Sequence, residues 1–559
     1  MVGVPGRSKG CATCRKRRVK CDEAKPLCQR CIKAGFECLG YGRERLWRHT
    51  STASFPTKML RMGNATETVS VILAPPRELS FVAFQDDMCL AQLFQNFVWH
   101  SYGRLWLDQA AKGRLGALSR DAATALSQNS FGRVNRTREV ELKGVVKYGN
   151  CLRILADELG SVTQLSCKGP ELVVAVLILM IYTSMQADRA AAVFHLKGIA
   201  RIMALCGPQA FQVQPYRNAF DAGRATLLVA SLFSKQRMFL EEPKWQTVPW
   251  ALDPTAKSAQ SYLLDIFTVI PGLLEEYSRL EEPGSVPQTY AQFIDPSLLI
   301  QDASSSRDRD GLCDRAAAQL ERLYRWRWNW QRTNSQCVSR AQPPSQSSRQ
   351  TVAALGSTGT PRNLDRLAFD KPRNANDIML YNAALMWLLA LLWKLEPLRA
   401  ASIIERAAKG AAPHLGQATH PPTGAPEYTA RPRQSDAAIS ISSFEPLRRP
   451  GSSLSIRDPA VEICRVYEWQ SRNHARCAAA EDQLCLYLFP VGMARSVLDA
   501  EPESRAWIRA MLDASPVTSG YGREGENIAG FGFYVTKEAL DPDGLGAGGA
   551  GAAAYAGVL

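Results

Sequence analysis

The chain has 559 residues, of which 46% are hydrophobic and 21% charged, so most of it is expected to fold, and it is too long for one hydrophobic core. The net charge is +14, and +9 of that lies in residues 1–48, where 13 Lys or Arg accompany four acids. Such a local basic segment predicts a polyanionic partner for the N-terminal region. The first ten residues contain no apolar run of the secretory kind, which argues against an oxidising compartment.

The first motif along the chain is a cysteine repeat, Cys-x2-Cys-x6-Cys, written twice with an offset of 17 residues. Two tetrahedral zinc ions need eight ligand positions, and six thiolates fill them only if two sulfurs bridge both metals. The sequence therefore favours a binuclear zinc site. Its predicted ligands are Cys11, Cys14, Cys21, Cys28, Cys31 and Cys38.

Two other uses of these cysteines stay open on the residues alone. A four-cysteine zinc ribbon would leave Cys21 and Cys38 unused at matched positions of the repeat. A disulfide knot has 15 possible pairings but lacks a secretory context. No histidine lies between Cys11 and Cys38, which disfavours mixed cysteine and histidine fingers.

This stretch resembles the fungal binuclear zinc cluster transcription factors, the class typified by the yeast galactose regulator. The resemblance rests on residues 11–38, including CRKRRVKCDEAKPLC with Pro26 between the halves. It implies zinc as cofactor, a nuclear location, double-stranded DNA as partner, and a transcription regulator for RNA polymerase II that is not an enzyme. It also implies bridging by Cys11 and Cys28. Cys14 and Cys21 would complete one zinc, and Cys31 and Cys38 the other.

The basic residues lie in the first half of the repeat, where five of six residues between Cys14 and Cys21 are cationic. Guanine offers major-groove acceptors to Arg and Lys, whereas phosphate contacts give affinity without sequence preference. By the resemblance, Arg17 and Arg18 would read bases, usually of a CGG triplet. The other three cations are predicted to meet phosphates: Arg15, Lys16 and Lys20. The alternative is that this run is only a nuclear localisation signal or a solvated face.

Residues 39–79 are polar and interrupted by prolines, and no heptad pattern follows the cysteines, so they are interpreted as a linker. A homodimer, if formed, must then use the larger C-terminal region, which is also expected to bind co-regulators. That region is predicted to be all-helical, with a proline helix start at Pro170. The predicted helices cover residues 81–102, 140–159, 172–182, 190–205, 217–240, 258–280, 312–330, 376–395 and 458–498.

The predicted fold is therefore a small zinc cluster followed by a large all-α regulatory domain with two Ser/Pro/Gly-rich disordered insertions. Strand-like alternation occurs only at residues 530–536. Predicted boundaries are 1–45 for the zinc cluster; 46–80 for the linker; 81–332, 373–411 and 457–515 for the helical domain; 333–372 and 412–456 for the insertions; and 516–559 for the tail.

The helical region also resembles the family's regulatory domain, through FHLKGIARIMALCGP (194–208) and FLEEPKWQTVPW (239–250). No catalytic constellation is evident, and His195 is interpreted as structural. The Trp326, Trp328 and Trp330 series is interpreted as packing. The apolar runs 172–182 and 378–393 are shorter than the roughly 20 residues that a bilayer needs, which favours buried core helices. Rival functions are a helical enzyme or ligand-binding protein tethered to nucleic acid, and a zinc-dependent interaction module.

Overall fold

The structure is a computed structural model, and it describes residues 10–24, 27–39, 84–96, 104–160, 162–186, 189–281, 309–341, 365–412, 444–473 and 488–513. The chain divides into two compact units, residues 1–80 and 81–559. Each unit is described by itself.

The N-terminal unit contains two five-residue helices, α1 (Ala12–Lys16) and α2 (Gln29–Lys33). The second helix begins 17 residues after the first, which is the offset of the cysteine repeat. Helices this short are not stable alone. Four cysteines with at most 1% exposure form the core of this unit: Cys11, Cys14, Cys28 and Cys31.

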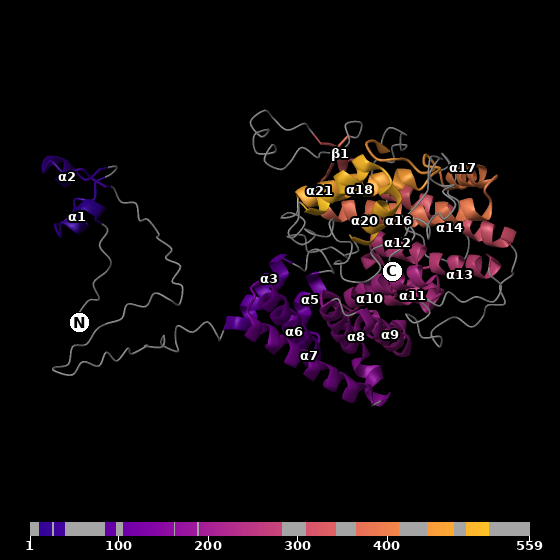
Figure 1. The fold of residues 1–559 in the computed structure, drawn as a ribbon, viewed down its shortest axis with the longest axis horizontal. Coiled ribbons are helices and arrows are strands. Elements are labelled where there is room, and N and C mark those ends of the chain that lie inside the picture. The colour runs from indigo at the N-terminus through magenta and orange to yellow at the C-terminus, as the bar shows by residue number, and fades with distance from the viewer. Residues whose placement is uncertain are drawn as a thin grey trace. The chain divides into compact units, whose positions relative to one another are not determined.

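The second unit is mostly helical, and Figure 1 shows its early helices, α3 to α9, grouped on one side. They share one hydrophobic core with the segment that follows them, up to Trp250. These helices are α3 (Gln85–Asn96), α5 (Arg104–Ala111), α6 (Ala117–Val134), α7 (Arg138–Leu159), α8 (Val162–Met185) and α9 (Arg189–Cys206).

A second hydrophobic core is built largely from the later helices, which Figure 1 shows on the other side of the unit. A two-stranded antiparallel sheet, β1 (Val338–Arg340) with β2 (Leu367–Phe369), lies beside them. The helices that contribute to it are α10 (Tyr216–Ser234), α12 (Ala259–Phe267), α13 (Ile270–Glu281), α14 (Arg309–Thr333), α16 (Pro372–Leu395), α17 (Ala400–Ala411), α18 (Arg457–Arg472), α20 (Leu488–Leu498) and α21 (Pro502–Asp513). The short helix α11 (Pro243–Thr247) contributes Trp245 to the first core instead. Short 3-10 turns occur at Pro208–Phe211, Phe239–Glu241, Val248–Trp250 and Pro254–Ala256.

Helix α16 is the central element of the second core. Its first residue is a proline, which suits a position where the missing N–H has no helical partner. It is the one helix among the described residues that is long and apolar enough to cross a membrane, yet 89% of its apolar window is buried inside the fold. Residues 172–182 of α8 are likewise buried. Both apolar runs are core helices, as the sequence predicts.

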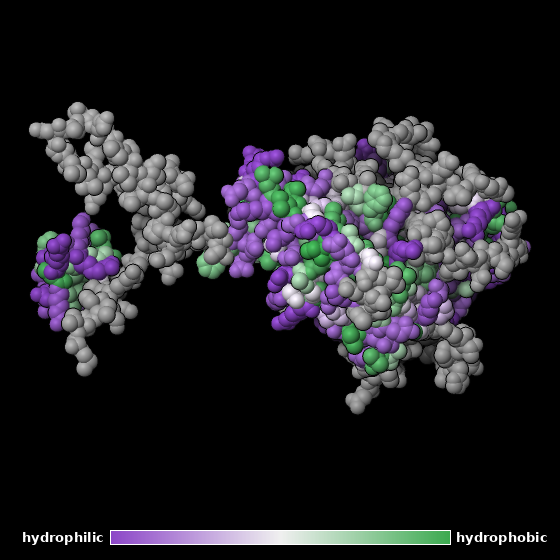
Figure 2. All heavy atoms as spheres, turned by 90° about the horizontal axis from the view of Figure 1, so that it is seen from below, coloured by the Kyte–Doolittle hydropathy of each residue, from purple (hydrophilic) through white to green (hydrophobic). Residues whose placement is uncertain are grey.

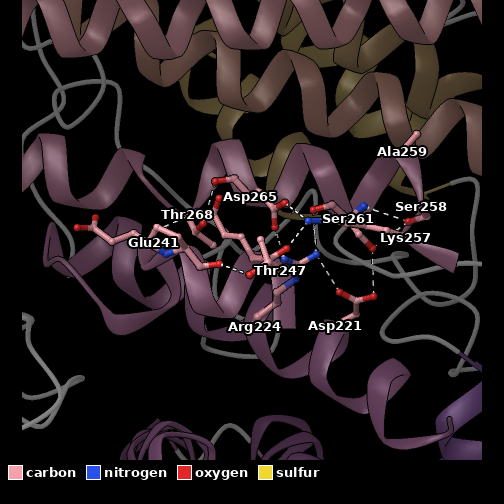
Figure 3. Close-up of polar contacts among 12 residues, drawn as sticks. Asp221, Arg224, Glu241, Thr247, Lys257, Ser258, Ala259, Ser261, Asp265 and Thr268 are labelled. Atoms are coloured by element: carbon pink, nitrogen blue, oxygen red, sulfur yellow. Dashed lines mark hydrogen bonds and ion pairs between the residues drawn. The ribbon is translucent and has the colours of Figure 1, made fainter. Parts of the chain in front are cut away.

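A buried ion network joins α10 to α12 and to Lys257 just before it (Figure 3). The Arg224 guanidinium lies 2.9 Å from Asp221 and 2.7 Å from Asp265, and Lys257 pairs with the second Asp265 oxygen. Three of these four side chains are at most 3% exposed, and Asp221 is 8% exposed. Both cations also lie over the Trp250 ring, at 4.9 Å for Arg224 and 4.5 Å for Lys257. Two acids thus balance two bases, as a buried charge cluster requires.

Several predicted boundaries are wrong. Pro170 lies inside α8, eight residues after its start, and not at a helix start. The predicted helix 217–240 ends at Ser234, where Lys235 turns into the left-handed region with φ 49°. The predicted helix 258–280 is two helices, broken just before Pro271, whose ring has no N–H for a continuous helix.

The predicted insertions are also partly wrong, because their edges are folded. In the 333–372 insertion, β1 and β2 pair with Val338 opposite Phe369. In the 412–456 insertion, the last residues pack on the core, with Phe444 only 2% exposed. The linker 46–80, the tail 516–559 and the strand at 530–536 lie outside the described residues, as do parts of the helices predicted at 81–102 and 458–498.

Candidate metal centre and nucleic-acid interface

The structure brings the six thiols of the repeat together in two overlapping groups. Within each group the Sγ atoms lie within 4.8 Å of one another, and Cys11 belongs to both. This sharing is what a sulfur that bridges two metals requires. The first group is Cys11, Cys14, Cys21 and Cys28; the second is Cys11, Cys31 and Cys38.

The sulfur spacing fits zinc. Tetrahedral ligands at the Zn–S distance of about 2.3 Å lie roughly 3.8 Å apart. The Sγ atoms of Cys14 and Cys28 are 3.7 Å apart, and those of Cys11 and Cys31 are 3.8 Å apart. Cys21 and Cys28 are 3.5 Å apart. These five thiols, at this spacing, form a donor set suited to zinc.

Backbone N–H groups orient the outer thiols in the same way in both halves. The Cys11 amide donates to Cys21 Sγ at 3.4 Å, and the Cys28 amide donates to Cys38 Sγ at 3.3 Å. These two bonds are related by the 17-residue offset of the repeat. Amide donors favour a thiolate over a thiol, and they hold the sulfur in place as outer-shell partners hold metal ligands.

Burial changes how firmly two of the thiols hold their protons. Burial raises the pKa of Cys14 and raises that of Cys31 to about 12. Because zinc binds thiolate, loading must expel these protons. Metal affinity should therefore fall as the pH falls.

Both short helices end in the same backbone turn, a Schellman motif. After α1, Val19 N–H donates to Cys14 C=O and Arg18 N–H donates to Arg15 C=O. After α2, Phe36 and Gly35 repeat these two bonds 17 residues later. The turning residue has positive φ in each half, 56° at Arg18 and 70° at Gly35.

All five predicted DNA-contacting cations are exposed, and they run from the second turn of α1 into the segment that follows it. One of them, Arg17, makes a contact within the domain that the sequence did not predict. The Arg17 guanidinium stacks on the Phe36 ring of the second half, 3.6 Å from its centroid. The remaining four are Arg15, Lys16, Arg18 and Lys20.

Three side chains that sequence reasoning missed join the two halves. Thr13 Oγ1 donates to Glu37 C=O at 2.9 Å and accepts from the Leu39 amide at 3.0 Å. Asp22 accepts from the Arg30 amide at 2.6 Å, which satisfies a free N–H at the start of α2. Arg30 Nη1 donates to Lys20 C=O at 3.1 Å and so ties the basic segment to α2. The only sign of these three residues in the sequence is that each is polar and stands within two positions of a cysteine of the repeat.

In the helical unit, His195 and two tryptophans of the series at 326–330 make hydrogen bonds within the fold. His195 is buried and shares a 3.2 Å hydrogen bond with the Tyr148 hydroxyl. Trp326 donates to Ala259 C=O, and Trp330 donates to Asp377. Among the described residues, no disulfide joins the cysteines outside the repeat: Cys89, Cys151, Cys206, Cys313, Cys337 and Cys464.

A two-fold repeat of short helices around six clustered thiols, with cations on one half, defines a class of domain. Residues 9–48 match the family described as the fungal Zn(2)-Cys(6) binuclear cluster domain. The chain thus has an N-terminal zinc cluster domain, with two zinc ions as its cofactor, followed by a mostly helical body.

Several fungal regulators match the chain, and the likeness to them is confined to this domain. An uncharacterized transcriptional regulatory protein of Schizosaccharomyces pombe is 66% identical over 32 residues, 6% of each chain. The transcriptional regulatory protein moc3 of the same yeast is 62% identical over 32 residues, again 6% of each. The aspercryptin biosynthesis cluster-specific transcription regulator atnN of Emericella nidulans is 62% identical over 39 residues, 7% of this chain and 6% of that one. No solved structure matches the chain.

Proposed function

We propose that this protein is a sequence-specific DNA-binding transcription factor that regulates RNA polymerase II and reads a CGG-like triplet in the major groove. The observation that carries the proposal is the asymmetry of the repeat: its halves share one backbone design, but the exposed cationic run follows α1 alone. A zinc scaffold without a DNA target would not need this charge on one half. The fungal regulators that match the domain support the same function.

The proposed metal roles are those that the resemblance to the zinc cluster family implies. Cys11 and Cys28 bridge, Cys14 and Cys21 complete one zinc site, and Cys31 and Cys38 complete the other. Cys11 lies in both groups of the structure, which supports its bridging role. Metal analysis of the purified protein should give two zinc ions per chain, and one ion would contradict the bridging arrangement.

The cations divide into base readers and phosphate contacts. Arg17 and Arg18 lie where α1 ends and read guanine edges, each good contact supplying roughly 1–3 kcal/mol of discrimination. Arg15, Lys16 and Lys20 meet phosphates and supply salt-dependent affinity. Because α1 has only five residues, zinc provides the folding free energy that holds these side chains in place.

The division is tested by comparing Arg18→Ala with Lys20→Ala on matched and mismatched DNA across a salt series. Arg18→Ala should relax base preference at one position. Lys20→Ala should weaken binding to all sequences alike and reduce the salt slope by about one. Identical effects of the two changes would contradict the assignment.

The remaining parts of the proposal concern the whole protein. It acts in the nucleus, is not an enzyme, and uses the helical unit for regulation, binding of co-regulators and homodimerisation. Apart from the folded edges of the two insertions, the predicted segment boundaries, from the zinc cluster at 1–45 to the tail at 516–559, stand as its proposed organisation. The rival is a zinc-dependent interaction module without a DNA target.

A further inference from the structure

The two halves of the cysteine repeat hold each other through equivalent contacts. Thr13 Oγ1 donates to the Glu37 carbonyl at 2.9 Å. Arg30 Nη1 donates to the Lys20 carbonyl at 3.1 Å. Both donors are the second residue of their helix, and both acceptors directly precede the last cysteine of the other half. Each helix therefore holds the backbone of the other half at the same point of the repeat.

The two equivalent donors differ in charge. In the first half the hydroxyl of Thr13 makes the contact, so holding the backbone does not require a cation. In the second half the donor is a guanidinium with several N–H groups, and one of its nitrogens suffices for the Lys20 carbonyl. Arg30 is exposed, and within the part of the chain that the structure describes its guanidinium has no carboxylate partner. The side chain therefore keeps donors and a positive charge for a partner outside the chain.

The acid that contacts Arg30 bonds to backbone groups. Asp22 Oδ2 accepts from the Arg30 amide at 2.6 Å, and Asp22 Oδ1 accepts from the Ala24 amide at 3.1 Å. The first bond fixes the main chain of Arg30, while its guanidinium is fixed by the Lys20 carbonyl. Arg30 is thus held at two points. A side chain held in advance loses less conformational entropy when it binds a partner.

The contact with Lys20 places the Arg30 charge at the end of the cationic run. Lys20 is the last cation of that run, and its side chain is exposed. Because Arg30 Nη1 bonds to the Lys20 backbone, the two halves bring positive charge to the same part of the surface. Figure 2 shows the N-terminal unit as largely hydrophilic on the face in view. Guanidinium and phosphate form strong charge-assisted hydrogen bonds, often two at once, so this part of the surface suits a phosphate backbone.

We propose that Arg30 is a further DNA-contacting residue, which binds a backbone phosphate beside the one that Lys20 meets. This inference rests on the proposed function and adds a contact from the second half of the repeat. Phosphate contacts fix the orientation of a protein on the duplex without reading sequence. Arg30 therefore aligns the domain from its second half, while base reading stays with the first half.

The test is equilibrium binding of the full-length, zinc-loaded protein to duplexes with and without a CGG triplet, across a salt series. Arg30→Gln removes the charge but keeps a side-chain N–H that can reach the Lys20 carbonyl. The slope of log affinity against log salt should fall by about 0.9, with the preference for CGG unchanged. Arg30→Lys should keep the wild-type slope. Lys33→Gln is the matched control, since it removes an exposed cation from the last position of the same helix, and it should leave the slope unchanged.

Neutral methylphosphonates, placed one at a time around the triplet, locate the contact. One position should weaken binding of the wild type and of Lys33→Gln, and have no further effect on Arg30→Gln. A wild-type salt slope in Arg30→Gln would overturn the inference, and so would loss of its two zinc ions, which would mark a structural role. If the wild type prefers CGG while Arg30→Gln binds as the wild type does, only this inference fails. A wild type without preference for CGG would overturn the proposed function, and this inference with it.

Discussion

Arg18 and Gly35 occupy the same position in the two halves of the cysteine repeat, with φ of 56° and 70°. Each follows the cap of a five-residue helix and closes the same pair of backbone hydrogen bonds. Glycine adopts this conformation freely, whereas a residue with a side chain pays roughly 1 kcal/mol. Strain of this kind at one of two equivalent positions points to a use for the side chain.

Replacing Arg18 by Gly should separate stability from function. The variant should hold zinc as well as the wild type and unfold at higher denaturant concentration, with a gain of about 0.5–1 kcal/mol from relief of strain. Its DNA affinity should fall, because a base contact is lost. The converse control is Gly35→Ala, where a Cβ has room but φ is unfavourable, and a loss of about 1 kcal/mol is expected. Full DNA affinity in Arg18→Gly would contradict the assignment of Arg18.

The stacking of Arg17 on Phe36 should couple these residues in DNA binding. The ring holds the guanidinium near the end of α1, and an exposed cation–π contact supplies about 0.5–1 kcal/mol. Phe36→Ala should therefore weaken binding several-fold, and should have almost no further effect in an Arg17→Ala background. A double-mutant cycle on DNA affinity measures this coupling. Ile32→Ala, an exposed apolar change on α2, serves as the control, and additive effects of Phe36→Ala and Arg17→Ala would refute the coupling.

Removal of one acid from the buried ion network should destabilise the helical unit strongly. Asp265→Ala leaves Arg224 and Lys257 without their shared partner, and breaking a buried charge group in this way costs about 3–5 kcal/mol. The midpoint of denaturant unfolding reports this loss. Asp253→Ala, at a side chain 52% exposed and 4.0 Å from Arg217, should change it little. Equal midpoints for the two variants would show that the network does not stabilise the fold.

Glu241 should make stability depend on pH. Burial raises the pKa of Glu241 from its ordinary 4.5 to about 7, with Arg237 opposing the shift and Glu276 adding to it. The folded protein therefore holds this proton more tightly than the unfolded chain. The stabilisation that comes from this tighter proton binding at Glu241 is fully present below pH 4.5 and is lost as the pH rises towards 7.

The unfolding free energy of Glu241→Gln should accordingly change less with pH than that of the wild type. Between pH 5 and 7.5 the difference in this change should be about 1–3 kcal/mol. Chemical unfolding of both full-length proteins at each pH measures the difference. Glu242→Gln, which alters a carboxylate paired with Lys244 at the surface, is the control. A wild type and a Glu241→Gln protein with parallel pH profiles would contradict this account.

The thiol cluster could be predicted from the sequence because metal ligation fixes residue type and spacing together. The position of α7 could also be predicted, since its apolar period is undisturbed by Pro. The contact of Arg17 with Phe36 could not, because it joins residues from the two halves through a turn geometry that no side-chain pattern encodes. The β1–β2 pairing was hidden because two three-residue strands are too short to show alternation.

The helix break before Pro271 and the continuation of α8 through Pro170 show why boundaries were less predictable. The same residue type ends one helix and is accommodated in another, and tertiary packing decides between the two outcomes.

The most direct test of the central claim is selection of bound sequences from random DNA with the full-length, zinc-loaded protein. If the exposed cations of the first half read bases, a short GC-rich triplet of the CGG kind should be enriched, and its repeat and spacing would report the dimer as well. Arg18→Ala should lose enrichment at one position of the triplet. Failure of the wild-type protein to enrich any sequence would contradict the account and favour a zinc-dependent interaction module.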